Sequence, residues 1–212
     1  MHEIEPYYHW RHLYIAEEDP RSPFYGQTYS EFEFSQTVYN YYIHPQWDTI
    51  GSKTLYIKLL FADYDMGYGI IEIIGEWNDA IENDIMTFKR EILEKLMDEG
   101  IYKFIFIGEN IFNFHNGDRD YYEELYEELS DENGWAVMVN LNQAAQHDFL
   151  LKKLNRYIEL MEFEKWLMAF RIRRLRPIAR QTLCSRWSNF RLLGCVVQKC
   201  SAFNRPLSSR NL

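Results

Sequence analysis

The sequence predicts an α/β protein with a mixed sheet and a parallel core, and three observations lead to that prediction. Apolar runs rich in β-branched and aromatic residues, which favour strands, occur at 54–62, 68–74, 101–107 and 135–139. Segments with helical spacing separate the last three runs. Strands joined by helices of this length need crossover connections, so those three strands are expected to be parallel.

Tyr-rich strands are expected ahead of this core, in an aromatic-rich β segment covering residues 1–50. His9–Ile15 has the composition of a strand and is followed by a loop containing two prolines. Phe32 and Phe34 alternate with polar residues, which is the pattern of a half-buried strand. The run Val38–Ile43 fits a strand or a helix, and its β-branched and aromatic residues favour the strand.

The first two strands of the core, 54–62 and 68–74, are expected to form a hairpin through residues 63–67. Asn78 or Asp79 can then cap a helix. The apolar positions of that helix recur every three or four residues: Ile81, Ile85, Phe88, Ile92 and Leu96. Gly100 is expected to end it as a left-handed cap.

Two further helices complete the expected core. One begins at Asp118 or Asp120 and runs through Leu129, and Gly134 leads from it into the last strand. The other starts at Asn142 and is expected to continue, with a break, to Arg176.

The resulting order β-β-α-β-α-β-α, between about 54 and 170, resembles that of STAS-type domains, the sulfate-transporter and anti-sigma-factor-antagonist fold. The resemblance rests on element order alone and matches no family motif. It implies a regulatory role. Those domains present a phosphorylatable Ser or Thr after the strand that corresponds to Ile101–Ile107, whereas residues 108–118 of this chain contain neither.

The charges divide the chain into an acidic body and a basic tail. All 32 Asp and Glu lie within residues 1–170, which hold 13 Lys and Arg and so carry a net charge of −19. Residues 171–212 carry ten Lys and Arg and no acid. We therefore expect a single acidic α/β domain over 1–170, with the STAS-like layout at 54–170, and a disordered basic tail over 171–212. The tail could contact RNA, lipid or the body itself.

Several classes of protein are disfavoured. No apolar run reaches the eighteen or so residues of a membrane span, and the acidic N-terminus does not look like a secretion signal, so a cytoplasmic location is expected. The acidic body is unsuited to gripping nucleic acid. The three cysteines, Cys184, Cys195 and Cys200, match no zinc or redox spacing, and no nucleotide-binding motif is present, so no cofactor and no metal are expected.

One polar pattern recurs at what are expected to be strand ends. Glycine followed by glutamate occurs at Gly75-Glu76 and again at Gly108-Glu109. Because ligands bind at the carboxyl ends of parallel strands, one rim could gather the candidate site residues Glu76, Asp79, Glu109, Asn110, His115 and Asp118. Carboxylates with a histidine could bind a divalent cation or perform acid–base chemistry. The alternative is that Asn78, Asp79 and Asp118 only cap helices and that the glutamates face water.

Other polar residues admit two interpretations each. His9 and His12 are three apart, which on a strand places them on opposite faces. His44 and Asp48 flank a loop that could line a pocket, although turn chemistry is favoured there. Glu72, inside an isoleucine-rich strand, faces solvent or else is buried with a partner, which would shift its pKa.

The sequence as a whole favours a non-catalytic interaction or regulatory module with a protein partner. One alternative is a small enzyme or metal-binding protein that uses the strand-end carboxylates and histidine. Another is an acidic inhibitor of a basic protein or nuclease.

Overall fold

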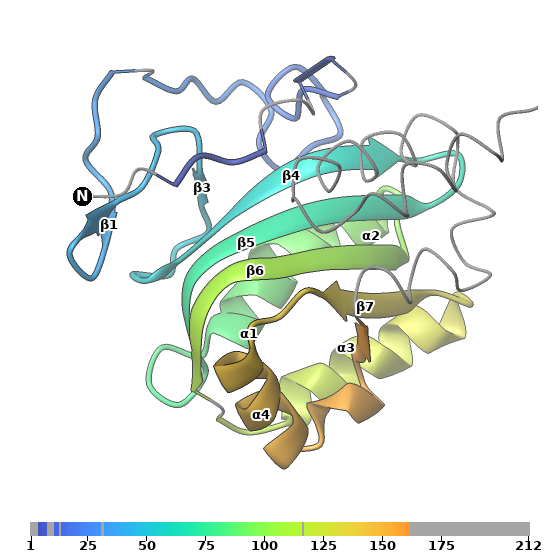
Figure 1. Cartoon of the computed structure of the whole chain (residues 1–212). Helices are drawn as coiled ribbons and strands as arrows, with labels where there is room; N and C mark the ends of the chain where they lie inside the picture. The colour runs from blue at the N-terminus through green and yellow to red at the C-terminus, as the bar shows by residue number, and fades with distance from the viewer. Residues whose placement is uncertain (1–3, 8–10, 13, 31, 116, 162–212) are drawn as a thin grey trace, which may run out of the picture.

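The computed structural model describes residues 4–7, 11–12, 14–30, 32–115 and 117–161. A six-stranded mixed sheet forms its centre, with helices on one face and the N-terminal segment on the other (Figure 1). The six strands of this sheet are β3 (Asp48–Thr49), β4 (Leu55–Asp63), β5 (Tyr68–Asn78), β6 (Lys103–His115), β7 (Trp135–Val139) and β8 (Glu159–Met161), and a separate two-stranded sheet consists of β1 (Thr37–Val38) and β2 (Tyr41–Tyr42). The helices are α1 (Asp84–Phe88), η2 (Lys89–Leu93), α2 (Glu94–Asp98), α3 (Asp120–Asp131), α4 (Gln143–Leu151) and η3 (Leu154–Arg156).

The predicted mixed sheet with a parallel core is confirmed. Its strand order is β3-β4-β5-β6-β7-β8. The hairpin partner β4 runs antiparallel to β5, while β5, β6 and β7 run parallel to one another. A fourth parallel strand, β8, pairs with β7 where the sequence predicted helix. The predicted start of that region is confirmed, because Asn142 caps α4, whereas the short η3 and β8 replace the helix that was expected to continue beyond α4 within the described residues.

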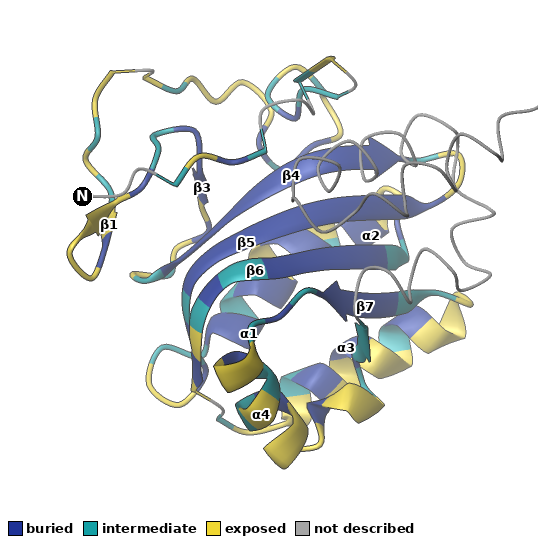
Figure 2. Cartoon of the chain, in the orientation of Figure 1, coloured by how far each residue is buried: buried dark blue, intermediate teal, exposed yellow. Residues whose placement is uncertain are grey.

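Alternation along the central strands explains why they are apolar throughout. In β6, Phe104 and Phe106 face the helices, while Ile105 and Ile107 face the opposite side. Both sets are buried (Figure 2). Ile85, Phe88 and Leu96 of the helices cover the first set, and Tyr7, Tyr14 and Ile15 of the N-terminal segment pack against the second cluster.

The first predicted helix exists, but it starts later than expected. Ile81 is 81% exposed and precedes the helix, which begins at Asp84 after Asn83 in a left-handed conformation. The middle of the helix, Lys89–Leu93, is π-helical. Gly100 ends it as predicted, at φ +88°, with its N–H donating to the carbonyl of Met97.

The first 50 residues contain less strand than the sequence indicated. Within the predicted strand His9–Ile15, residues 11–12 form a 3₁₀ turn and residues 14–15 are irregular. Phe32 is exposed in irregular chain, so the expected alternation at Phe32 and Phe34 is wrong. Residues 37–42 do form strand, but as the hairpin β1–β2 with its turn at Tyr39-Asn40.

Strands β5 and β6 both run past the glycines that were expected to end them. Gly75 lies at a bulge, at φ +119°, where an added Cβ would be 1.9 Å from the carbonyl oxygen of Thr54. At Gly108 an added Cβ would be 2.8 Å from Met138 Sδ. Both glycines therefore allow close packing inside strands, and the residues that follow them belong to the sheet.

The basic tail 171–212, its three cysteines and His9 lie outside the described residues. No helix in the described part of the chain is both long enough and apolar enough to cross a membrane.

Candidate interaction site

Glu76 and His115 are the two predicted site residues that the structure brings into contact. His115 Nε2 lies 2.7 Å from Glu76 Oε1. The cause is the parallel register, in which Glu76 pairs with Asn113 and Asn78 with His115. Side chains two apart on a strand share a face, so these residues project from the same side of the sheet.

Tyr39, at the turn of the β1–β2 hairpin, joins this pair from a distant part of the sequence. Asn113 Nδ2 donates to Tyr39 Oη at 2.7 Å. Burial raises the pKa of Tyr39; the hydrogen bond of Asn113 lowers it, and the nearby Glu76 raises it further. Tyr39, Glu76, Asn113 and His115 are called the strand-end cluster below.

Asp79 lies apart from this cluster, buried under α1 and α3. Its Oδ1 accepts from Trp77 Nε1 at 2.9 Å and from the N–H of Ile85 at 2.8 Å, and its Oδ2 accepts from Tyr122 Oη. The bond to Ile85 satisfies a free donor in the first turn of α1, so Asp79 does serve that helix. Burial raises the pKa of Asp79 to about 6, despite the opposing effect of its donors.

The remaining candidates are spread along β6 and beyond it. Glu109 precedes Asn113, the partner of Glu76, by four residues, which is roughly 13 Å along a strand. Asn110 Nδ2 donates to Glu72 Oε1 at 3.3 Å. Asp118 is exposed ahead of α3. The six candidates therefore do not converge on one rim, because β5 and β6 continue where the sequence suggested that they end.

The arrangement at the strand ends suits recognition more than metal chemistry. Within the described residues, no group of three or more His, Cys, Asp and Glu side chains is placed to hold a metal ion. The cluster instead offers a carboxylate, an imidazole, an amide and a phenol at the surface. These groups donate and accept hydrogen bonds in the manner of a polar contact surface.

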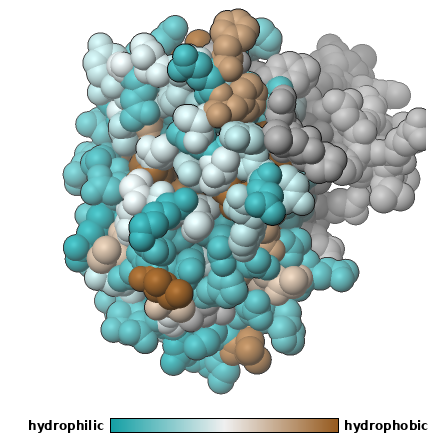
Figure 3. Space-filling view, turned by 90° about the vertical axis from the view of Figure 1, so that its left-hand side faces the viewer, coloured by the Kyte–Doolittle hydropathy of each residue, from teal (hydrophilic) through white to brown (hydrophobic). Residues whose placement is uncertain are grey.

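Aromatic rings lie next to the strand-end cluster. The rings of Tyr39 and Tyr41 lie 6.4 and 6.2 Å from that of Phe112, and the two tyrosines are 53% and 40% exposed. The cluster together with Tyr41 and Phe112 is called the hairpin patch. Figure 3 views the molecule from the side on which β1 lies in Figure 1; that face is mostly hydrophilic to neutral, with brown apolar atoms in separate spots.

The loop from His44 to Asp48 has a structural role, as the favoured interpretation stated. The N–H of Gln46 donates to His44 Nδ1, and that of Trp47 donates to the carbonyl of His44. Trp47 is fully buried beneath the hairpin, where its Nε1 donates to the carbonyl of Ile4.

A buried polar network on the helix-free face was not predicted. Lys58 is fully buried; its Nζ contacts Glu17 and lies 3.4 Å from Asp48 Oδ1. Tyr29 Oη donates to the same carboxylate. Burial raises the pKa of Asp48 to about 6, although Lys58 and Tyr29 act in the opposite direction. A lysine within an otherwise apolar strand was the available signal.

Glu72 belongs to the same face, opposite Lys58 in the β4–β5 register. It is fully buried, which contradicts the exposed interpretation and agrees with the alternative that it has partners. The N–H of Tyr7 donates to Glu72 Oε2 at 3.1 Å. Together with Glu17 and Tyr29, this bond ties the N-terminal segment to the sheet.

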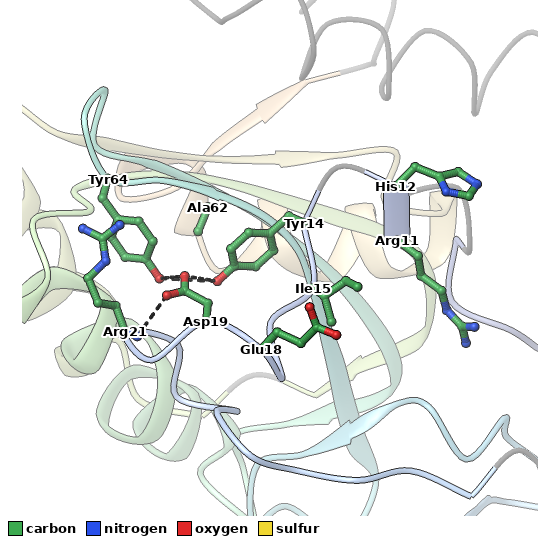
Figure 4. A pocket seen from close by; sticks show the side chains of 9 residues that line it. All are labelled: Arg11, His12, Tyr14, Ile15, Glu18, Asp19, Arg21, Ala62 and Tyr64. Atoms are coloured by element: carbon green, nitrogen blue, oxygen red, sulfur yellow. Dashed lines mark hydrogen bonds between the residues drawn. The ribbon is translucent and has the colours of Figure 1, made fainter.

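An open hollow of about 510 Å³ lies where the N-terminal segment meets the end of β4. Tyr14 Oη and Tyr64 Oη both donate to Asp19 Oδ2, at 2.8 and 2.7 Å (Figure 4). The guanidinium of Arg21 lies 3.6 Å from the centre of the Tyr64 ring. This site was not predicted from the sequence, because its side chains come from segments about 45 residues apart.

No protein-family model matches this chain. No curated protein matches it at the threshold for a significant hit. Among solved structures, it is similar to the anti-sigma factor antagonist SpoIIAA in its unphosphorylated form, with 13% identity, a TM-score of 0.44, and coverage of 57% of this chain and 98% of that one. For the phosphorylated Bacillus protein the TM-score is 0.38, with 13% identity over 52% of this chain and 96% of that chain.

TM1081 of Thermotoga maritima is similar with 14% identity, a TM-score of 0.40, and coverage of 66% of this chain and 98% of that chain. These structures belong to the group of proteins that the element order resembles. At such identities and TM-scores, no residue role passes from them to this chain.

Proposed function

We propose that this chain is a non-catalytic protein-interaction module whose partner binds the hairpin patch. The observation that carries the proposal is the meeting of exposed tyrosines with the strand-end cluster, at a place where three separate segments converge. Tyrosine is enriched at the centres of protein interfaces because it offers a large rigid ring and a hydrogen-bonding tip.

The strongly perturbed acids support a role without catalysis. Asp48 and Asp79, whose pKa values are raised to about 6, are the carboxyls that an enzyme could use near neutral pH. Both are buried, and both accept hydrogen bonds from the protein's own side chains. A catalytic acid must reach its substrate, and neither of these carboxyls reaches the surface.

The proposal can be tested by placing a photo-crosslinking amino acid at Tyr41 and exposing the cells that express the protein to light. We expect one protein to be enriched at this position over a probe at Leu151, which is 69% exposed on α4. The captured protein is then purified and titrated with the parent chain. Tyr41→Ala and His115→Ala are each expected to weaken its binding at least tenfold, whereas Leu151→Ala leaves binding unchanged.

Equal enrichment at Tyr41 and Leu151, or binding that tolerates both patch substitutions, contradicts the proposed surface. His115→Gln separates hydrogen bonding from the imidazole ring itself, because the glutamine amide can still donate to Glu76 but has no ring.

The acidic face of α3 favours a second candidate, a basic partner. Glu123, Glu124 and Glu127 are exposed along this helix. Lys89 forms ion pairs with Glu94 of α2 and with Glu124 and Glu128 of α3. It therefore neutralises only part of the negative charge of this face. A crosslinker at Tyr126, which is 47% exposed, probes this face. Capture there in place of Tyr41, with binding that weakens steeply as salt is raised, would favour the second candidate.

A further inference from the structure

We propose that the hollow beside Tyr64 binds a small organic anion, a carboxylate or phosphate group carried on an apolar body. The site is separate from the hairpin patch, and the inference does not depend on the proposed function. Nine residues line it: Arg11, His12, Tyr14, Ile15, Glu18, Asp19, Arg21, Ala62 and Tyr64. Its volume, about 510 Å³, lies within the range of about 300–1,000 Å³ that is usual for ligand sites.

Arg21 supplies the anion-recognising group. Its guanidinium lies over the face of the Tyr64 ring, a contact that uses none of its N–H donors. Among the described residues, no side chain or carbonyl accepts a hydrogen bond from this guanidinium, and the side chain is exposed. A guanidinium held over an aromatic face keeps its planar fork of donors available, and that fork matches the two oxygens of a carboxylate or phosphate.

The tyrosine side chains beside Arg21 are held in place before any ligand binds. One carboxylate oxygen of Asp19 accepts hydrogen bonds from the hydroxyls of both Tyr14 and Tyr64 (Figure 4). The other oxygen accepts from the backbone N–H of Arg21 at 3.0 Å. Burial opposes the charged form of Asp19, but these hydrogen bonds and the positive charge of Arg21 outweigh it and lower its pKa. The carboxylate is thus engaged within the protein, and a ligand that enters finds rigid rings in place of mobile side chains.

The rest of the lining favours an apolar ligand body. Ile15 and Ala62 contribute aliphatic surface next to the ring of Tyr14, between Arg21 on one side and His12 on the other (Figure 4). Glu18 is also in the lining and would repel a second anionic group placed there. A ligand with a single anionic head on Arg21 and its body against Tyr14 and Ile15 satisfies all of these groups.

Isothermal titration of the full chain with matched probes tests the proposal. Benzoate and phenyl phosphate each carry an anionic group on an aromatic ring, and inorganic phosphate is the anion without the ring. Benzamide is a neutral isostere of benzoate, and benzylamine carries a positive charge in place of the negative one. We expect saturable binding of benzoate or phenyl phosphate at millimolar concentration or below. Benzamide and benzylamine are expected to bind at least tenfold more weakly, and inorganic phosphate more weakly than phenyl phosphate.

Two substitutions of arginine separate the site from general charge effects. Arg21→Gln is expected to weaken anion binding at least tenfold. The matched control is Arg90→Gln, since Arg90 also lies over a tyrosine, 5.6 Å from the ring centre of Tyr121, on the helical side of the molecule. Equal losses for the two variants, no saturable anion binding by the parent, or a preference for benzylamine would each overturn the proposal. Unchanged melting temperatures of both variants show that the fold is retained.

Discussion

Asp79 illustrates how a single side chain can connect parts of this fold that are distant in sequence. It joins the end of β5, the first turn of α1 and the first turn of α3 through three hydrogen bonds. The same burial that makes those bonds strong makes the charged carboxylate costly, and its pKa is raised to about 6 from 3.8. In this protein, the buried carboxyl with a raised pKa has a structural role, since it holds these three elements together.

The pKa of Asp79 leads to a prediction about stability and pH. Between about pH 4 and 6 the folded chain holds a proton that the unfolded chain has released, so the free energy of unfolding falls as pH rises through this window and then levels off. Asp79→Asn removes that contribution, which is at most about 3 kcal/mol. Urea unfolding at pH 4.5 and pH 7 measures it, with Asp98→Asn as the control, since Asp98 is exposed at the end of α2. A pH dependence that survives in Asp79→Asn would show that other groups cause it.

At the level of the elements, the bulge at Gly75 controls the path of the sheet. The bulge lets β5 continue for three more residues, to Asn78, and these residues carry Glu76 toward His115. Only glycine fits at this point, because a side chain at position 75 would collide with the backbone of Thr54.

Replacement of Gly75 by alanine is therefore expected to be costly. The added methyl would meet the carbonyl of Thr54 at 1.9 Å, and φ is +119°, so we expect a loss of about 2–4 kcal/mol in the free energy of unfolding. Gly26→Ala is the matched control, because φ is +73° there but nothing lies within 4 Å of the added Cβ. About 1 kcal/mol is expected for that variant. Equal losses in the free energy of unfolding for the two variants would show that the close approach of position 75 to Thr54 is not the cause of the destabilisation.

The elements that could be predicted from the sequence are those that their local residue pattern determines. The hairpin β4–β5, the parallel strands and the Gly100 cap follow from local apolar period and turn chemistry, and all are present. The glycines at 75 and 108 misled because glycine commonly ends a strand. The alternation nevertheless continues beyond them, through buried Trp77 and Phe114.

The described residues between 4 and 30 could not be predicted in the same way, because side-chain contacts with remote residues hold several of them in place. Tyr14 is fixed by Asp19 and Tyr64, and Glu17 by Lys58. Such contacts leave no periodic trace in the sequence. Half of the candidate site was missed for the same reason, since Tyr39 reaches Asn113 across 74 residues.

At the level of the whole molecule, the described sheet and its helices end at Met161, before the basic tail. We propose that the acidic body alone forms the folded unit and that residues 171–212 are an appendage to it. A chain that ends at Phe170 is then expected to stay soluble and to melt within about 2 °C of the parent, since a change of 1 kcal/mol shifts the melting temperature by about 2–4 °C at this size. Scanning calorimetry of both chains measures this, and a much lower melting temperature for the shorter chain would place the tail within the folded unit.

The contacts of the N-terminal segment also set an order of events during synthesis. The hairpin β4–β5 needs only a short connection to close, whereas Tyr7 bonds to Glu72, 65 residues later. The N-terminal segment thus leaves the ribosome before β4 and β5, yet it has no surface to bind until both strands have been translated. Until then Tyr7, Tyr14 and Ile15 stay uncovered, and a chaperone that binds apolar nascent chain would meet them before the sheet has formed.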